Sequence, residues 1–432
     1  MSSLARTFWL LLTVSLLAGC STISGWFPSD DDDDPQSPAD LIAIDEQLNV
    51  RKLWSVGVGN GQGKGLYKLQ PVIDDDVIYA ASADGEVRAV TTADGKTLWR
   101  EKLKRGLAGG VGVYNDALFV GSADGEVLRL SAQTGELLWE SRVSGEILAP
   151  PQSNGRVVVA QTYDGKLYGL DFESGERLWR YDSNVPVLTI RGTSTPIVDG
   201  NTIYAGFASG RVLAFDASDG SVRWESRIAI PQGRSEIERI VDVDGRMALA
   251  GTELYVASYQ GRIVALDTRT GRKIWQRNTS SFFGVSQGFG NVYLAEENGT
   301  ITAFLRIGQG IRWEQDARAW RGLAQPVPVS SYLAIVDFQG YMHFLSQVDG
   351  EFVARVRPDG DGVRADPIAE GNTLYVYSNS GKLIAYDGRP KGGGYVAGHR
   401  TGWTAKRRQV HALQPAHPVA GRIGRGLCRP HA

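Results

Sequence analysis

Histidine and cysteine, on which most nucleophilic and zinc-dependent catalysis relies, are scarce and unevenly placed in this 432-residue chain. Four of the five histidines and one of the two cysteines, Cys428, fall within the last 34 residues, and His343 is the only histidine before them. A Ser-His-Asp triad, a Cys-His pair or a His-based zinc site each needs partner side chains that residues 21–394 do not contain. The sequence therefore disfavours most hydrolase chemistry and predicts no catalytic residue, metal or cofactor. We expect His343 to be a strand residue without a chemical role.

The charge of the chain is as unevenly distributed as its histidines. Residues 395–432 hold seven Lys and Arg and no acidic residue, so residues 1–394 carry 39 basic against 48 acidic side chains. A protein body that binds nucleic acid should be basic. The acidic balance of residues 1–394 therefore predicts no nucleic-acid partner.

The first cysteine, Cys20, stands in a pattern that predicts covalent lipidation. Arg6 precedes an apolar run over residues 8–18, too short to span a bilayer comfortably, which ends in Leu17-Ala18-Gly19-Cys20. This matches a bacterial lipoprotein signal, in which residues 1–19 are removed and the Cys20 thiol accepts the lipid. Several acyl chains on one residue anchor a protein stably, whereas one chain is marginal. An ordinary cleaved secretory signal with an incidental cysteine is the alternative.

The residues that follow Cys20 predict where the anchor lies and how far the body stands from it. Ser21 occupies the position where an Asp would favour retention in the inner membrane, so the signal implies the periplasmic face of the outer membrane. Residues 20–50 contain three prolines and the acidic run 30–34, a composition that repels itself into an extended chain. We expect a disordered tether over 20–50. A calcium site in the acidic run is the sharper alternative, but consecutive carboxylates need a shaped loop to face one ion.

A repeat of about 40 residues occupies the centre of the chain. One unit reads VIYAASADGEVRAVTTADGKTLW and ends at Trp99, and six further units end at Trp139, Trp179, Trp224, Trp275, Trp313 and Ala354. This period is the length of one four-stranded propeller blade. An eighth unit at 373–387 stops before its outer strand, whereas residues 53–56 form an outer strand without a blade. The sequence therefore predicts an all-β, eight-bladed β-propeller of antiparallel blades over 51–388, closed by pairing of the N-terminal strand with the last blade.

Glycine and tryptophan recur at fixed places in each unit. We expect a left-handed glycine to close the first hairpin at Gly85, Gly125, Gly165, Gly210, Gly261, Gly299 and Gly340, and the second at Gly95, Gly135, Gly175, Gly220, Gly271, Gly310 and Gly350. The tryptophan three or four residues beyond the second glycine belongs to the outer strand, where we expect it to pack between neighbouring blades. In the unit that lacks it, Phe352 is the expected substitute. Short segments with proline, such as Gln70-Pro71-Val72 and Asp366-Pro367-Ile368, are expected to be innermost strands beside the axis.

The repeat, with its A-x-D, T/S-G and Trp positions, resembles the pyrroloquinoline-quinone-type propeller repeat. That repeat is shared by quinoprotein dehydrogenases and by lipoprotein subunits of the outer-membrane β-barrel assembly machinery. With its lipoprotein signal, its eight units and its few insertions, the sequence over 17–387 resembles the second group. The resemblance implies a non-catalytic scaffold that binds the periplasmic POTRA domains of the barrel-forming subunit BamA and assists insertion of outer-membrane proteins.

Two segments, 186–192 and 235–244, match the loops through which such lipoproteins engage BamA. By that match the candidate partner-binding residues are Leu188, Ile190, Arg191, Asp242 and Asp244. The spacing of the repeat points to the same place, because 45 residues separate Trp179 from Trp224 and 51 separate Trp224 from Trp275. Lengthened loops on a rigid scaffold commonly carry binding. Asp242 and Asp244 alternate along a possible strand, so both could face one way, toward a basic partner or toward Arg191 itself. A salt bridge within the protein remains the alternative for Arg191.

Two other functions stay open on the sequence. One is a quinone-dependent dehydrogenase, although the chain lacks the adjacent cysteine pair and the long insertions usual in those enzymes. The other is a periplasmic platform that binds unfolded outer-membrane protein precursors or peptidoglycan, for which exposed strand edges at the blade rims could add an extended peptide.

The C-terminal residues 395–432 break every trend above, and we expect residues 389–432 to be disordered. Codons can be chosen so that a frame shifted by one base over residues 395–432 reads as the start of a bacterial P-loop GTPase, with GRPNVGKS as its phosphate loop. We therefore expect the residues from 395 onward to be a frameshift product rather than a functional tail.

Overall fold

The computed structural model describes residues 37–65, 68–190, 192–307, 310–317 and 319–391. The chain divides into two units, residues 1–391 and residues 392–432, and the described residues all lie in the first. The predicted lipidation site Cys20, the acidic run 30–34, Arg191 and the tail from 395 lie outside the described residues. Expectations about these parts therefore stay predictions.

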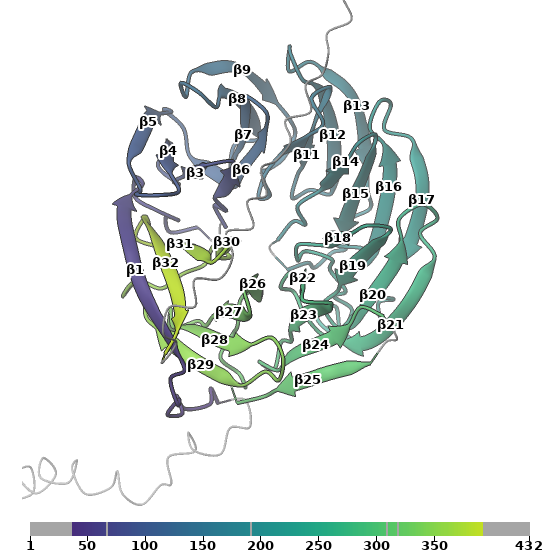
Figure 1. Ribbon diagram of the computed structural model, residues 1–432. Coiled ribbons are helices and arrows are strands. Elements are labelled where there is room, and N and C mark those ends of the chain that lie inside the picture. The colour runs from purple at the N-terminus through teal and green to yellow at the C-terminus, as the bar shows by residue number, and fades with distance from the viewer. Residues whose placement is uncertain (1–36, 66–67, 191, 308–309, 318, 392–432) are drawn as a thin grey trace, which may run out of the picture. The chain divides into compact units, whose positions relative to one another are not determined.

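The first unit is built from eight four-stranded antiparallel sheets arranged in a ring (Figure 1). We number these blades along the chain. Blade 1 holds β2 (Val72–Asp74), β3 (Val77–Ala81), β4 (Glu86–Thr91) and β5 (Thr97–Lys102). Blade 2 holds β6 (Leu107–Tyr114), β7 (Ala117–Ser122), β8 (Glu126–Ser131) and β9 (Leu137–Arg142). Blade 3 holds β10 (Gln152–Ser153), β11 (Val157–Gln161), β12 (Lys166–Asp171) and β13 (Arg177–Asp182). Blade 4 holds β14 (Ile197–Asp199), β15 (Thr202–Phe207), β16 (Arg211–Asp216) and β17 (Val222–Arg227).

The remaining four blades complete the ring. Blade 5 holds β18 (Ala248–Ala250), β19 (Glu253–Ala257), β20 (Gly261–Asp267) and β21 (Lys273–Thr279). Blade 6 holds β22 (Ser286–Gly288), β23 (Asn291–Ala295), β24 (Ile301–Leu305) and β25 (Ile311–Gln315). Blade 7 holds β26 (Val327–Val329), β27 (Tyr332–Val336), β28 (Met342–Ser346) and β29 (Phe352–Val356). Blade 8 holds β30 (Ile368–Glu370), β31 (Thr373–Tyr377), β32 (Lys382–Pro390) and, as its outer strand, β1 (Leu48–Gly57).

Burial follows the position of a strand within its blade. The two middle strands are almost continuously apolar and buried, as in β3, because neighbouring blades cover both of their faces. The outer strands alternate, as in β5, because one of their faces meets solvent. The core is therefore a ring of apolar layers between blades rather than a single central cluster.

Pairing of the N-terminal strand with the last blade closes the ring, as the sequence predicted. β1 runs antiparallel to β32, from the pair Leu48 and Pro390 to the pair Gly57 and Lys382. The eight-bladed all-β fold is thereby confirmed. The folded part begins earlier and ends later than the expected 51–388. The reason is that β1 begins at Leu48, and β32, with which it pairs, continues to Pro390.

Residues just before β1 also pack on the ring, where the sequence predicted a disordered tether up to residue 50. The Ala39 amide donates to the Ala319 carbonyl at 3.0 Å, and the Gln47 amide donates to the Val353 carbonyl at 2.9 Å. The Arg321 guanidinium donates to the Ala39 carbonyl at 2.9 Å. These bonds hold the backbone of residues 39–47 against blades 6 and 7, so the expected tether is wrong for this stretch.

His343 supports the same part of the ring from inside blade 7. It lies on β28, as expected of a strand residue, and its Nε2 is 3.1 Å from Asp337 Oδ2. Arg321 Nε donates to the same Asp337 oxygen at 2.9 Å. The histidine is thus part of the buried polar cluster that positions Arg321, and Arg321 in turn holds Ala39.

Each outer-strand tryptophan packs on the next blade, which confirms its expected place between blades. A Cβ added at Gly95 would lie 2.6 Å from the ring of Trp54, and the Trp54 indole N–H donates to the Thr92 carbonyl at 3.0 Å. Gly95 has a φ of +69°, so a side chain there would be strained as well as crowded. The same packing joins Trp99 to Gly135, Trp139 to Gly175, Trp179 to Gly220, Trp224 to Gly271 and Trp313 to Gly350.

Three details differ from the regular repeat. Trp275 of blade 5 does not lie on Gly310, the glycine expected in the second hairpin of blade 6, but against Phe304, with ring centroids 6.0 Å apart. In blade 5 the left-handed residue of the first hairpin is Gln260, with a φ of 43°, and not Gly261 as expected. In blade 7 the expected substitute Phe352 is buried, and its ring meets His343 edge to face at 5.8 Å. The hairpin can shift by one residue because glutamine tolerates the left-handed region at modest cost.

Replacing Trp54 by alanine should weaken the whole ring, because this side chain joins the closing strand to blade 1. We expect the free energy of unfolding in urea to fall by about 3 kcal/mol. The matched control is Leu53→Ala, whose side chain is exposed on the same strand and should change stability by less than about 0.5 kcal/mol. Equal urea midpoints for the two variants would contradict the closure.

Candidate functional site

Two long connections carry the segments that the sequence singled out. Residues 183–196 link β13 to β14, and residues 228–247 link β17 to β18. They touch each other: the Ile190 amide donates to Asp242 Oδ2 at 2.6 Å, and the Ser194 hydroxyl donates to the Gly245 carbonyl at 3.2 Å. The structure therefore brings together two segments that lie about 50 residues apart in the sequence.

Apolar side chains project from both connections into solvent. Val187 is 93% exposed and Leu188 is 41% exposed, whereas Ile190 is only partly exposed. On the other connection Ile237 is 65% exposed. The sequence predicted Leu188 and Ile190 but did not single out Val187 or Ile237, although both lie inside the matched segments. Large apolar residues within a lengthened loop were the signal that could have found them.

Ile237 sits in a well-ordered turn. The Glu238 carboxylate accepts hydrogen bonds from the Arg234 amide at 2.6 Å and the Ser235 amide at 3.1 Å. These bonds lower the pKa of Glu238 below its usual range. The Ile237 carbonyl accepts from the Gln260 side chain at 3.3 Å. The exposed isoleucine is thus presented by a fixed backbone.

Asp242 does not face outward as expected. It is completely buried, and its carboxylate accepts the Ile190 amide, while its Oδ1 has no hydrogen-bond partner among the described residues. Burial raises the pKa of Asp242 to about 7 despite the hydrogen bond from Ile190. A side chain without exposed surface cannot contact a partner directly, so its prediction as a contact residue needs correction. The alternation argument failed because residues 242–245 form no strand.

Asp244 is also turned inward. A Cβ at Gly192 would lie 2.8 Å from Asp244 Oδ2, so the carboxyl packs against the backbone of the other connection. Burial, together with the neighbouring Asp242, raises the pKa of Asp244 well above its usual range. Of the five predicted residues, Leu188 is therefore exposed, Ile190 is half-buried, and the two acids lie beneath them. Arg191 lies outside the described residues.

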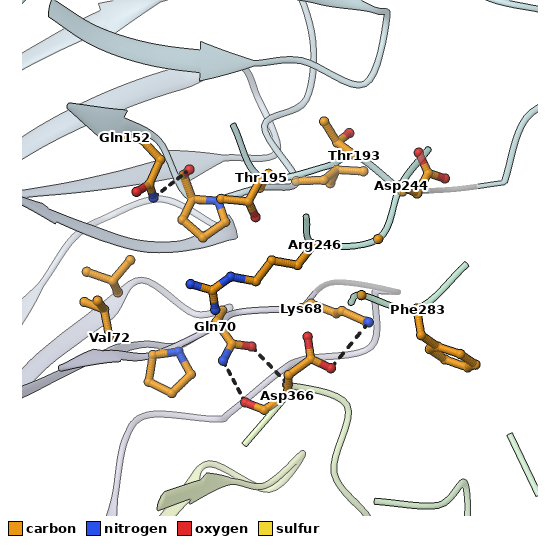
Figure 2. A pocket seen from close by; sticks show the side chains of 18 of the residues that line it. Lys68, Gln70, Val72, Gln152, Thr193, Thr195, Asp244, Arg246, Phe283 and Asp366 are labelled. Carbon is orange, nitrogen blue, oxygen red and sulfur yellow. Dashed lines mark hydrogen bonds and ion pairs between the residues drawn. The ribbon is translucent and has the colours of Figure 1, made fainter. Parts of the chain in front are cut away.

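A cavity of about 330 Å³ opens under the two connections, near the axis of the ring (Figure 2). Ile190, Gly192, Thr193 and Asp244 line it from the connections. The opposite wall includes Gln70, Pro71, Val72 and Asp366, which belong to the proline-containing segments expected beside the axis. These segments lie beside the axis, as the sequence predicted. The sequence did not indicate a cavity between them.

The described residues contain no group of three or more His, Cys, Asp and Glu side chains placed to hold a metal ion. Within the same part of the chain, no helix is long and apolar enough to cross a membrane.

Comparison with known proteins gives two kinds of likeness. The quinohemoprotein alcohol dehydrogenase of Comamonas testosteroni superposes with a TM-score of 0.63 over 79% of this chain and 76% of its own, at 16% sequence identity. At that identity the likeness shows the propeller fold alone. The crystal structure of BamB from Moraxella catarrhalis superposes with a TM-score of 0.72, at 27% identity, over 78% of this chain and 100% of the other.

Sequence comparison separates these two groups. The family model described as "Outer membrane protein assembly factor BamB" matches residues 83–315. The outer membrane protein assembly factor BamB of Pseudomonas aeruginosa is 55% identical over 349 residues, which cover 81% of this chain and 92% of the relative. The protein of the same name from Escherichia coli is 33% identical over 385 residues, covering 87% and 97%. The chain therefore belongs to the BamB family of outer membrane protein assembly factors.

Proposed function

We propose that this chain is a non-catalytic, lipid-anchored scaffold that binds the periplasmic POTRA domains of the barrel-forming subunit BamA. The observation that carries the proposal is the junction of residues 183–196 with residues 228–247, where exposed Leu188, Val187 and Ile237 stand on hydrogen-bonded backbone. Its relatives are named assembly factors of outer membrane proteins, which favours a scaffold over an enzyme.

The exposed apolar residues suit a protein interface. Binding energy at interfaces is concentrated in a few apolar or arginine side chains that become buried, and a rigid support lowers the entropy lost on binding. Val187 and Leu188 provide the apolar contacts, and Arg191 supplies a guanidinium beside them in the sequence. The ring supplies the rigid support, because β13, β14, β17 and β18 hold both ends of each connection.

Asp242 acts in this proposal as a positioning residue. Its carboxyl accepts the amide of Ile190, two residues from Leu188, and so fixes the backbone that presents the contact residues. Asp244 packs against Gly192 on the far side of the same turn. The two acids thus shape the 183–196 connection from below rather than touching BamA.

The membrane anchor fits the same face of the ring. Residues 183–196, 228–247 and 316–326 each lead from the outer strand of one blade to the inner strand of the next. Because the strands of every blade alternate in direction, connections of this kind share one face. Ala39 is bonded to Ala319 in the third connection, so the chain leaves the ring on the face that carries the partner-binding connections. From Cys20 to this point the chain can span at most roughly 65 Å.

Leu188→Asp should weaken capture of purified BamA POTRA domains at least tenfold, because it places a charge in the apolar contact. Arg191→Glu should have a similar effect. The matched control is Leu138→Asp, at a 48% exposed position on the outer strand β9, which should bind as wild type does. The measurement is the dissociation constant by biolayer interferometry, with a urea midpoint for each variant.

Binding of unfolded precursors separates this proposal from the platform alternative. Leu188→Asp should leave binding of an unfolded outer-membrane protein unchanged. Wild-type affinity of Leu188→Asp for the POTRA domains would refute the assignment of the connections.

Asp242→Asn should flatten the dependence of stability on pH. In the wild type the folded-state pKa of about 7 lies above the usual value of 3.8, so the folded state binds the proton more tightly than the unfolded state. Stability therefore falls as pH rises from about 4 to about 7. Asparagine keeps an acceptor for the Ile190 amide but cannot ionise. Urea midpoints at pH 5 and pH 8 should differ less in the variant than in the wild type.

The control for this experiment is Asp199→Asn, an exposed change at the end of β14. It should retain the wild-type difference between the two pH values. If the urea midpoints of Asp242→Asn differ between pH 5 and pH 8 as much as those of the wild type, the buried carboxyl does not titrate in this range.

Cys20→Ser should release the protein from the membrane, because serine cannot accept the lipid. We expect the wild-type chain in the membrane pellet of fractionated cells, and the variant in the soluble fraction or retained as an unprocessed precursor. Recovery of the variant in the outer membrane at wild-type level, with residues 1–19 removed, would contradict a lipid anchor.

A further inference from the structure

The cavity beneath the two connections combines apolar walls with polar groups at one side. Val72, Val111, Val113, Leu148 and Phe283 supply apolar surface from four different blade connections and strands. Thr193, Asp244 and Arg246 come from the two long connections. A concave site of about 330 Å³ that is mainly apolar, with a few convergent polar groups, has the character of a small-ligand site.

The charges around the cavity do not cancel. Lys68 Nζ lies 3.8 Å from Asp366 Oδ1, so these two charges compensate each other. Burial raises the pKa of Asp244 well above its usual range, which favours the neutral form of its carboxyl. The Arg246 side chain extends into the middle of the space in Figure 2, and it makes no hydrogen bond or ion pair with another residue that the structure describes. Among the described residues, the exposed Arg246 is therefore a positive charge at the cavity without an ion-pair partner.

Besides Asp366 Oδ1, which lacks a hydrogen bond but faces Lys68, two polar atoms at the cavity have no hydrogen-bond partner among the described residues. Thr193 Oγ1 and Asp244 Oδ2 are buried, and neither has a hydrogen-bond partner in the described part of the chain. Buried polar atoms are nearly always hydrogen-bonded in folded proteins. The hydroxyl of Thr193 and the guanidinium of Arg246 can donate hydrogen bonds, and so can the carboxyl of Asp244 in its neutral form. Three donors at one side of an apolar cavity call for an acceptor that carries negative charge.

We propose that this cavity binds a carboxylate with an apolar body, its oxygens on Arg246 and Thr193 and its body against Val72, Val113 and Phe283. A single uncompensated cation suits a monoanion better than a phosphate dianion. A cationic ligand would meet Arg246, and the Asp366 carboxylate on the opposite wall is already paired with Lys68. Such a carboxylate could be the end of a peptide chain or a free organic acid, and the two sources share the same recognition chemistry.

The test measures binding of two carboxylates to the purified full-length chain by isothermal titration calorimetry. N-acetylphenylalanine represents a peptide end, and 3-phenylpropionate represents a free acid. Ligands of this size should bind with dissociation constants of roughly 0.1–1 mM. The corresponding neutral amides should bind at least tenfold more weakly, because they lack the charge that pairs with Arg246.

Variants of the polar groups locate the site. Arg246→Gln should weaken binding of the two carboxylates at least tenfold and leave binding of the amides unchanged. Thr193→Val should weaken binding of the carboxylates by a smaller factor. The matched control is Arg272→Gln, an exposed arginine in the turn between β20 and β21 that does not line the cavity. It should bind both acids as wild type does.

Each outcome bears on the proposal. Tighter binding of N-acetylphenylalanine than of 3-phenylpropionate assigns the site to a peptide end, and equal binding assigns it to small organic acids. Three results would overturn the proposal: equal binding of acid and amide, an unchanged affinity for the acids in Arg246→Gln, or no binding of either acid at 10 mM. The binding of the probes does not require BamA, so its failure would leave the proposed scaffold role untouched.

Discussion

The structure depends on one repeated contact, a tryptophan of an outer strand lying on a left-handed glycine of the next blade. The indole needs the space that a Cβ would fill, and its N–H satisfies a backbone carbonyl of the neighbouring hairpin. Blades joined in this way form a row, and only the pairing of β1 with β32 turns the row into a ring. Trp54 then makes the same contact from the beginning of the chain, so closure uses the same chemistry as five other interfaces between blades. At the remaining two, Trp275 lies against Phe304 and Phe352 takes the place of the tryptophan. A closed ring has no open end at which a further blade could add.

The rigid ring allows the long connections to bind a partner without a large loss of entropy. A connection held at both ends by strands can present apolar side chains at little entropic cost, and the Asp242 hydrogen bond ties the connections 183–196 and 228–247 to each other. The chain before β1 is held against the same face through Arg321 and Ala39. Membrane attachment and partner binding in our proposal therefore act on one face of a body that does not need to change shape.

Most of the fold could be predicted from the sequence, because the period, the glycines and the tryptophans each report a local requirement of the blade. The closing strand was predictable for the same reason, since Trp54 stands in an outer-strand pattern without a blade. Asp242 was assigned the wrong exposure because alternation fixes side-chain direction only in a strand, and residues 242–245 do not form one. The packing of residues 39–47 depends on Arg321 and Val353, and the cavity joins Lys68 to Arg246 and Asp366. Contacts between such distant residues leave no local signal in one sequence.

Hydrogen–deuterium exchange of the full-length chain with and without BamA POTRA domains tests the central claim most directly. The account predicts that protection gained on binding is confined to peptides covering residues 183–196 and 228–247, with the outer strands β5, β9 and β13 unchanged. Protection along the outer strands, with none in those two connections, would contradict it.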